Sequence, residues 1–214
     1  MLIGISGKKQ SGKNLTANII KAIALLNNIK PFSNKDLQLK FIKNLSLLGV
    51  SRHENTSIYH LHSSPLKEIS FADNVKKIAS LITKIAPHDY NKEFIKQSNF
   101  ELLNITHREL LQKIGEGLRK SIDPDIWVKL TLQEYYKNKN KNIIITDVRY
   151  KNEADSIKKL NGILIRINRN EGDDNHQSEI DLDNYPDFDY TINNDSDIED
   201  LILKISNINA INFM

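Results

Sequence analysis

Apolar residues near the start of the chain change from a strand pattern to a helix pattern. Residues 2–6 (Leu-Ile-Gly-Ile-Ser) form a short and almost wholly apolar run, which is typical of a buried parallel strand. Beyond Lys13, apolar side chains recur every three or four residues, at Leu15, Ile19, Ile20, Ile23 and Ala24. That spacing predicts an amphipathic helix that begins near Lys13.

The rest of the chain alternates between short apolar runs and helical patterns. We expect strands at 67–71, 142–146, 163–167 and 190–192. We expect helices at 73–85, 107–120, 123–137 and 153–160, and a last helix that opens with the capping box of Ser196 and Glu199. Thr106 and Asp123, the latter followed by Pro124, are expected to cap two of these helices. Because strands alternate with helices, the expected fold is α/β, with three layers and a parallel central sheet.

Two stretches lack a clear pattern. Between residues 28 and 66, Asn, Lys, Ser and His interrupt short apolar pieces, and we interpret this stretch as a helix plus an irregular flap. Residues 87–104 are also irregular, and another helix is one interpretation of them. A length of 214 residues fits one globular domain with an elaborated flap. We therefore expect residues 1–214 to form a single domain.

A glycine-containing loop joins the first expected strand to the first expected helix. Residues 7–14 (Gly-Lys-Lys-Gln-Ser-Gly-Lys-Asn) match the pattern G-x-x-x-x-G-K-[ST] except at the last position. Gly7 and Gly12 allow the backbone to wrap a phosphate, so that loop N–H groups and the helix N-terminus face the anion. Lys13 is expected to reach the β- and γ-phosphates of a nucleotide. The alternative is a plain strand–turn–helix connection that binds nothing.

Asn14 departs from the pattern, because a hydroxyl at this position normally helps to hold magnesium. An amide oxygen is a weaker ligand, and the nearest hydroxyl, on Thr16, lies further along the helix. The phosphate charges of a nucleotide in a dry site nevertheless require a divalent cation. We expect Mg²⁺ as the cofactor, with ATP as co-substrate, and assign it no protein ligand.

A carboxylate follows the expected strand at 142–146. Asp147 is placed at the carboxyl end of this strand, the edge where ligands bind in open α/β sheets. It is suited to hold magnesium through water, or to bind a substrate hydroxyl or base, and its alternative role is to cap the next helix. Glu153 is spaced to form an ion pair with Arg149, which would make Arg149 a rigid fork for a phosphate dianion.

One expected helix carries Arg108 and Arg119 three turns apart, with Gln112 on the same face. A solvated helix face is the ordinary explanation of such a pattern, and a phosphate-binding face is the alternative. Trp127, the single tryptophan, follows the Asp123-Pro124 cap. Packing in the core and stacking on a base are both open for its indole.

Arg166 and Arg169 lie where the strand at 163–167 ends and a polar loop begins. Near a phosphate loop, an arginine on a mobile loop can neutralise charge during phosphoryl transfer. The polar loop that follows carries His176, Ser178 and Glu179. A histidine among acidic residues is more often a surface residue than a ligand.

Composition excludes several classes of function. The chain has no cysteine, which excludes disulfides, thiolate metal sites, iron–sulfur clusters and cysteine nucleophiles. A net charge of +3 is too small to argue for nucleic-acid binding, and no apolar run has the length of a membrane helix. We expect a soluble, cytoplasmic protein that binds small molecules and neither nucleic acid nor membrane. Arginine accounts for only 6 of the 30 basic residues, so each arginine is a candidate for a specific role.

Six segments, in this order, resemble the deoxynucleoside monophosphate kinases of tailed bacteriophages and large DNA viruses. They are Ser-Gly-Lys-Lys-Gln-Ser-Gly-Lys (6–13), Phe-Ala-Asp-Asn-Val-Lys (71–76), Arg-Glu-Leu-Leu-Gln-Lys-Ile-Gly (108–115), Asp-Ile-Trp-Val-Lys-Leu (125–130), Asp-Val-Arg-Tyr-Lys-Asn-Glu (147–153) and His-Gln-Ser-Glu (176–179). The resemblance covers both ends of the chain and breaks mainly at residues 28–66. It implies a P-loop kinase that transfers the γ-phosphoryl group of ATP to a (deoxy)nucleoside monophosphate, in the host cytoplasm if the protein is viral.

The resemblance also implies site residues. For ATP, the resemblance implies Gly12, Lys13, Asn14 and Leu15, where the family's usual Asp is replaced by Asn14. The loop pattern itself adds Gly7, Ser11 and Thr16 to the ATP-binding set. For the monophosphate, the resemblance implies Lys9, Val75, Lys76, Arg108, Gly115, Trp127, Asp147 and Glu153. The residue patterns described above add Gln112, Arg119 and Arg149 to this set. The expected catalytic residues are Lys13, Asp147 and a lid arginine, which is Arg166 or Arg169. The expected regions are a helical substrate-binding region at 72–138 and a lid-like loop at 169–182, and the family implies a homodimer.

Two alternatives stay open. Animal-type phosphomevalonate kinase is similar in the phosphate loop and around Leu182–Tyr190, and it also transfers a phosphoryl group from ATP to a phosphomonoester. The nucleotide enzyme is favoured by Trp127, Gln112 and the sequence of residues 148–153. The other alternative is a nucleotide-binding regulatory module without transferase activity, against which the clustered arginines argue.

Overall fold

The computed structural model describes residues 1–27, 39–40, 42–44, 64–169 and 181–212. Two compact units make up the chain: residues 1–68 together with 138–214, and residues 69–137. Most of the expected flap at 28–66 and of the expected lid-like loop at 169–182 lies outside the described residues, as do His176, Ser178 and Glu179. Among the helices that the structure describes, none combines the length and the apolar composition needed to cross a membrane.

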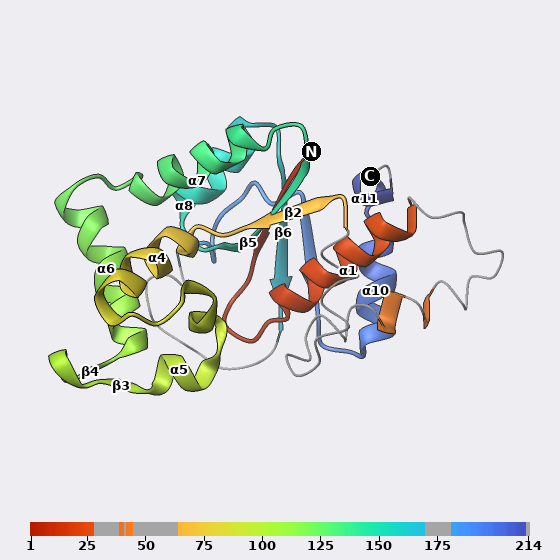
Figure 1. Cartoon of the computed structure of the whole chain (residues 1–214). Coiled ribbons are helices and arrows are strands. Elements are labelled where there is room, and N and C mark those ends of the chain that lie inside the picture. Colours follow the sequence, from red (N-terminus) through yellow and green to blue (C-terminus); the bar gives the residue numbers. More distant parts are fainter. Residues whose placement is uncertain (28–38, 41, 45–63, 170–180, 213–214) are drawn as a thin grey trace. The chain divides into compact units, whose positions relative to one another are not determined.

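The first unit is built on a five-stranded parallel sheet in the order β2-β5-β1-β6-β7 (Figure 1). Its strands are β1 (Leu2–Ser6), β2 (Leu66–Ile69), β5 (Asn142–Val148), β6 (Ile163–Asn168) and β7 (Tyr190–Asn193). Every strand expected from the apolar runs is present, although β5 extends two residues further, so that Asp147 lies inside it. The α/β fold with a parallel central sheet is confirmed.

The strand order places a ligand-binding edge at the end of β1. In this central strand Ile3 pairs with Ile144 of β5 and with Ile163 of β6. The chain first runs to β2 and β5 on one side of β1, and then to β6 and β7 on the other. Ligands of open α/β sheets bind at the carboxyl ends of strands where the order reverses in this way. The glycine-containing loop follows Ser6 directly and therefore lies at that edge.

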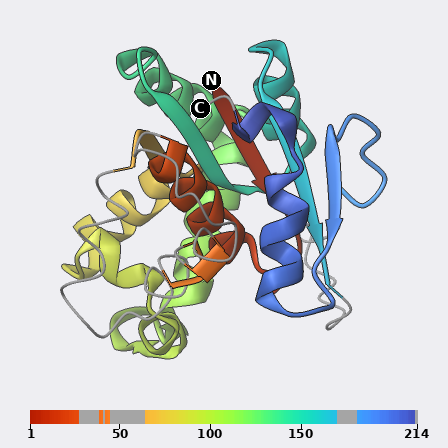
Figure 2. The ribbon, with the colours of Figure 1, turned by 90° about the vertical axis from the view of Figure 1, so that its right-hand side faces the viewer.

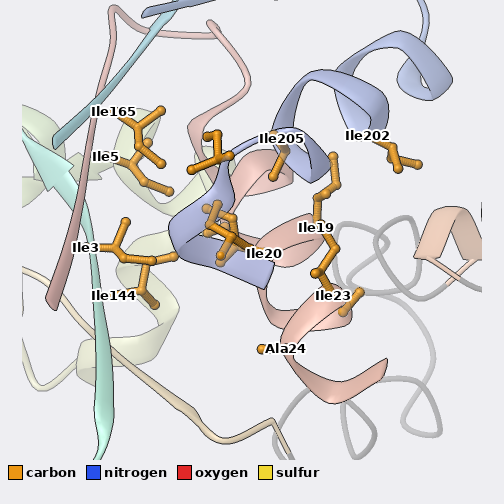
Figure 3. Packing of buried hydrophobic residues seen from close by; sticks show 14 of the residues in the cluster. Ile3, Ile5, Ile19, Ile20, Ile23, Ala24, Ile144, Ile165, Ile202 and Ile205 are labelled. Carbon is orange, nitrogen blue, oxygen red and sulfur yellow. The ribbon is translucent and has the colours of Figure 1, made fainter. Parts of the chain in front are cut away.

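One face of the sheet is covered by α1 (Lys13–Asn27), α10 (Ile198–Ser206) and α11 (Asn209–Asn212). Figure 2 shows α1 and α10 side by side against the strands. Ile3 and Ile5 of β1 point into this layer and join Ile20 of α1 and Ile205 of α10 in a fully buried cluster (Figure 3). Because successive side chains of a strand point to opposite faces, the odd-numbered residues of β1 point to this face.

The other face is covered by α8 (Lys151–Lys159). Gly4 of β1 points to this side, where a Cβ atom would lie 2.5 Å from Cδ1 of Ile157 and 2.8 Å from Cδ2 of Leu164. The missing side chain lets α8 approach β1 closely, because any larger residue would overlap its isoleucine. Helices on both faces confirm the expected three layers.

The second unit is mainly helical. It contains α4 (Ala72–Thr83), α5 (Glu93–Gln97), α6 (His107–Ser121) and α7 (Ile126–Lys137), the short strands β3 (Asn99–Phe100) and β4 (Ile105–Thr106), and the 3₁₀ turns η1 (Pro87–Asn91) and η2 (Glu101–Leu103). Ala79, Tyr90 and Leu110 form a buried centre between α4, η1 and α6. The irregular stretch at 87–104 is thus a series of short elements and not one helix.

Three helix starts test the expected caps. Thr106 opens α6 with a capping box, in which Oγ1 accepts from Glu109 N at 3.1 Å and the Glu109 carboxylate accepts from Thr106 N at 2.7 Å. Two other helix starts differ from expectation, by one and by three residues. The N-cap of α10 is Asp197 and not Ser196, since the Asp197 side chain accepts from Asp200 N at 2.9 Å. The helix expected from Asp123 begins at Ile126 instead.

Candidate active site

Residues 7–12 form a tight loop between β1 and α1. Gly12 has a φ of +99°, a conformation that favours glycine, and Gln10 also has a positive φ of 64°. A Cβ atom at Gly7 would lie 2.4 Å from Oγ of Ser11 and 2.5 Å from the carbonyl oxygen of Ile167. Gly12 is therefore favoured by its backbone conformation, and Gly7 is required by the close approach of Ser11 and Ile167. The loop ends where Thr16 N donates to the Gly12 carbonyl at 2.9 Å.

The side chain of Lys13 folds back over this loop. Its Nζ donates to the carbonyl oxygens of Gly7 at 2.6 Å and Lys8 at 2.5 Å. The ammonium group is therefore held directly against the loop backbone, where loop N–H groups are available to bind an anion. This is the position expected for a lysine that contacts nucleotide phosphates.

The side chains at the end of the loop and in the first turn of α1 have three different environments. Ser11 is 2 % exposed, and its hydroxyl has no hydrogen-bond partner among the described residues. Asn14 is exposed at the first turn of α1, so its amide oxygen is accessible to a ligand. Thr16 is fully buried and Leu15 packs against the apolar cluster of the sheet. The side chains of Leu15 and Thr16 therefore belong to the packed interior of the first unit.

Asp147 lies next to an irregularity in β5. The register between β1 and β5 shifts between Gly4, which pairs with Ile145, and Ser6, which pairs with Val148. One extra residue of β5 is accommodated there, and such bulges redirect side chains beside active sites. Asp147 is half-buried while its neighbours Thr146 and Val148 are buried.

Glu153 holds the segment after β5 through the backbone. Its carboxylate accepts from Arg149 N at 2.8 Å and from Tyr150 N at 3.1 Å, and its side chain is 1 % exposed. We expected Glu153 to position Arg149 as an ion-pair partner. The contacts shown here position Arg149 through its main chain, since they fix the turn that opens α8.

Arg166 lies within β6, where hydrogen bonds anchor its side chain. It is not at the start of the loop that follows the strand. It is 8 % exposed, and Nη1 donates to Oγ of Ser6 at 3.0 Å. Nη2 donates to Oδ1 of Asp183 at 2.7 Å, and the other oxygen of Asp183 lies 3.2 Å from Nζ of Lys8. Arg166 and Asp183 thus connect the end of β1 with the phosphate loop. Of the two lid candidates, the exposed one is Arg169.

In the second unit, four of the expected substrate residues share a face of α6. Arg108, Gln112, Gly115 and Arg119 follow one another at helical spacings of four, three and four residues. Gln112 is exposed and the two arginines are half-buried. The expected common face is confirmed, and its cations are suited to bind a phosphate group.

Two expected substrate residues of this unit, Arg108 and Lys76, contact acidic or amide side chains. Arg108 donates to Glu93, and although burial alone would raise the pKa of the Glu93 carboxyl group, Arg108 holds that pKa below its ordinary value. Nζ of Lys76 lies 3.0 Å from Oδ1 of Asn91 and 3.5 Å from Oδ1 of Asp73. A bound phosphate would therefore compete with these acidic and amide side chains for the same cations.

Two expected substrate residues are interior residues. Val75 is 8 % exposed on α4, and Trp127 is 1 % exposed on α7. For Trp127 this burial favours the core-packing alternative over base stacking. Lys9 is an exposed residue of the phosphate loop.

Two residues near the loop were missed by the sequence analysis. Asn194 donates to the Ser11 carbonyl, and Asp183 contacts Lys8. A signal for Asn194 was present, because it lies two residues beyond the expected strand at 190–192 and the carboxyl ends of parallel strands share one edge. No local pattern marks Asp183, which is one of several acidic residues between positions 181 and 189.

Comparison with known proteins gives two matches. Residues 34–205 match the model of a family described as deoxynucleotide monophosphate kinase. A protein of Acanthamoeba polyphaga mimivirus, named "Putative deoxynucleotide monophosphate kinase", is 30% identical over 154 residues, which are 64% of this chain and 80% of the viral protein. The family match begins after the phosphate loop, so the assignment of the loop stands on its own motif and geometry. Neither match favours phosphomevalonate kinase or a regulatory module.

Proposed function

The chain belongs to the deoxynucleotide monophosphate kinase family, and on that premise we propose that it transfers the γ-phosphoryl group of ATP to a (deoxy)nucleoside monophosphate. The products are ADP and the nucleoside diphosphate. The observation that carries the ATP half of this proposal is the loop at the end of β1, where Lys13 lies against the carbonyls of Gly7 and Lys8. The acceptor half rests on the family and on the arginine face of α6.

The chemistry requires little from the protein beyond position and charge. An acceptor phosphate is already nucleophilic, so no strong general base is needed. Lys13 and the loop N–H groups would bind the β- and γ-phosphates, with Arg169 as the exposed arginine that neutralises charge on the transferring group. Arg108 and Arg119 would bind the acceptor phosphate, together with Lys76 of the same unit. Asp147 would bind the nucleoside or a hydrated metal ion.

Magnesium fits the residues at this site. Mg²⁺ bound to a nucleotide is held mostly by phosphate oxygens and waters, with one or two protein oxygens. Asn14 and Asp147 offer such oxygens, since one is exposed on the first turn of α1 and the other is half-buried at the end of β5. No group of three or more metal-binding side chains occurs in the described part of the chain, and this mode of binding does not need one. When bound, the ion would neutralise phosphate charge.

The test is product formation from a panel of substrates. Purified full-length protein is incubated with ATP and Mg²⁺ and, separately, with dTMP, dGMP, dCMP, dAMP, the ribonucleotides and phosphomevalonate, and the nucleoside diphosphates are separated by chromatography. We expect at least one deoxynucleoside diphosphate to form. Release of ADP without any diphosphate product, or turnover of phosphomevalonate alone, would refute the proposal.

A variant of Lys13 tests whether this activity depends on the phosphate loop. Lys13→Ala is expected to lower kcat by about 100-fold or more, since it removes a charge that acts on the transferring phosphoryl group. Lys159→Ala is the matched control, because Lys159 is an exposed lysine of α8 with no expected role. Near-normal turnover by Lys13→Ala would contradict the assignment of the loop.

A further inference from the structure

Asn194 lies beside the phosphate loop, although 183 residues separate it from Ser11. It directly follows β7, and its backbone N donates to the Asn168 carbonyl at 2.7 Å, which extends the pairing of β6 with β7 by one residue. The residue is 7 % exposed. Its position is therefore set by the sheet and not by a flexible connection.

The Asn194 side chain contacts the backbone of the loop at one peptide group. Its Nδ2 donates to the Ser11 carbonyl oxygen at 2.9 Å, in a buried hydrogen bond. Gly12 comes next, and a Cβ atom at Gly12 would lie 2.4 Å from the same Nδ2. The carboxamide thus fills the space that the absent side chain of Gly12 leaves open.

This contact fixes the orientation of the peptide group between Ser11 and Gly12. In a trans peptide the carbonyl and the following N–H point in opposite directions, and no described peptide bond is cis. Because the Ser11 carbonyl faces Asn194, the N–H of Gly12 faces away from it. Glycine adopts positive and negative φ with similar ease, so without this hydrogen bond the peptide group would flip at little cost and direct a carbonyl where an N–H had been.

We propose that Asn194 is a positioning residue for nucleotide binding, which holds the Gly12 N–H in the orientation that donates to a phosphate of ATP. This inference rests on the proposed function only in that the loop binds ATP. It assigns no role to Asn194 in acceptor binding, because the hydrogen bond of its side chain goes to the phosphate loop. Its loss should therefore affect ATP and spare the monophosphate.

Two variants and one control test the inference. Asn194→Asp keeps the shape of the side chain but accepts instead of donating, so it would favour the flipped peptide, in which the Gly12 N–H points at the new carboxylate. Asn194→Ala removes the hydrogen bond without adding a charge. Asn193→Asp is the matched control, since it adds the same charge one residue earlier at an exposed position.

ATP affinity is measured by titration calorimetry on full-length protein with Mg²⁺, and kcat and KM are measured for ATP and for the accepted monophosphate separately. We expect both Asn194 variants to raise the Kd and the KM for ATP about tenfold or more over the control. The KM for the monophosphate should change less than about threefold. Melting temperatures are recorded in parallel, and hydrogen exchange of residues 7–13 should be faster in both variants.

The outcomes separate a positioning role from a structural one. If either folded variant has an ATP Kd within about twofold of the control, the inference is wrong, whatever its melting temperature. A lower melting temperature with an unchanged Kd would mean that Asn194 only stabilises the fold. Should Asn194→Asp fail to fold, Asn194→Ala decides by the same criterion.

The experiment also distinguishes this inference from the proposed function. Calorimetry needs no acceptor, so a wild-type protein that binds ATP but forms no diphosphate would refute the kinase proposal and leave the Asn194 test intact. A working kinase whose Asn194 variants bind ATP normally would refute the inference alone. A wild-type protein that binds no ATP would refute both.

Discussion

The indole Nε1 of Trp127 donates to the carbonyl oxygen of Gly115 at 2.9 Å, which joins α7 to the middle of α6 in the second unit. Gly115 lies on the face of α6 that carries Arg108 and Arg119, where a Cβ atom would be 3.9 Å from Nη1 of Arg119. The single tryptophan therefore binds the backbone of α6 at a residue of the candidate phosphate-binding face. This buried contact favours a packing role for the indole over stacking on a base.

Trp127→Phe is expected to lower the stability of the second unit by about 1–3 kcal/mol, because it removes a buried hydrogen bond and part of a fully buried ring. The KM for the monophosphate should change less than about threefold. Chemical denaturation followed by circular dichroism measures the stability, and the diphosphate assay measures the KM. Tyr136→Phe is the control, since Tyr136 is 55 % exposed on α7. A stable variant with a KM raised tenfold or more would instead support base stacking.

The two lid candidates are expected to behave differently. Arg166→Ala removes the guanidinium that bridges Ser6 and Asp183, and we expect a loss of about 1–3 kcal/mol of stability. Arg169→Ala changes an exposed residue, so we expect a nearly unchanged melting temperature and a kcat lowered about 100-fold. Thermal unfolding and steady-state kinetics on both variants make the comparison. A stable but inactive Arg166→Ala protein beside a fully active Arg169→Ala protein would reverse these roles.

The capping box of α6 predicts an acid-sensitive contribution to stability. Hydrogen bonds from the Thr106 backbone and hydroxyl lower the pKa of Glu109 below its ordinary value of 4.5. Because the folded protein has the lower pKa, this stabilisation is complete above about pH 4.5 and is lost as the pH falls through the folded pKa. Stability of the second unit, followed by the fluorescence of Trp127, should therefore decrease below that pH.

Glu109→Gln isolates this effect. Glutamine can still accept from the Thr106 N–H but does not titrate, so the variant should lose less stability than the wild type between about pH 5 and pH 3. Identical acid profiles for the two proteins would show that Glu109 does not contribute.

The kinase family is shown by the comparisons, and several finer expectations stay predictions. They are the single-domain organisation, the homodimer, the cytoplasmic location, magnesium and the individual site residues.

Local patterns in the sequence predicted the local features of the protein. Apolar runs marked the strands, helical spacing marked α1 and α6, and Thr106 with Glu109 formed the expected capping box. The phosphate loop was predictable for the same reason, since its glycines and Lys13 act within a few residues of one another. Errors occurred where neighbouring polar residues compete for one role, as Ser196 and Asp197 do at the start of α10.

Residues close together in the chain specify most of the helices and strands, the phosphate loop and the family resemblance. The folded protein alone shows which side chains meet across the sheet: Arg166 with Ser6, and Asn194 with Ser11. Those contacts depend on β1 lying between β5 and β6 and on β7 pairing beyond β6. Strand order is set by the packing of the whole unit, and no run of adjacent residues encodes it.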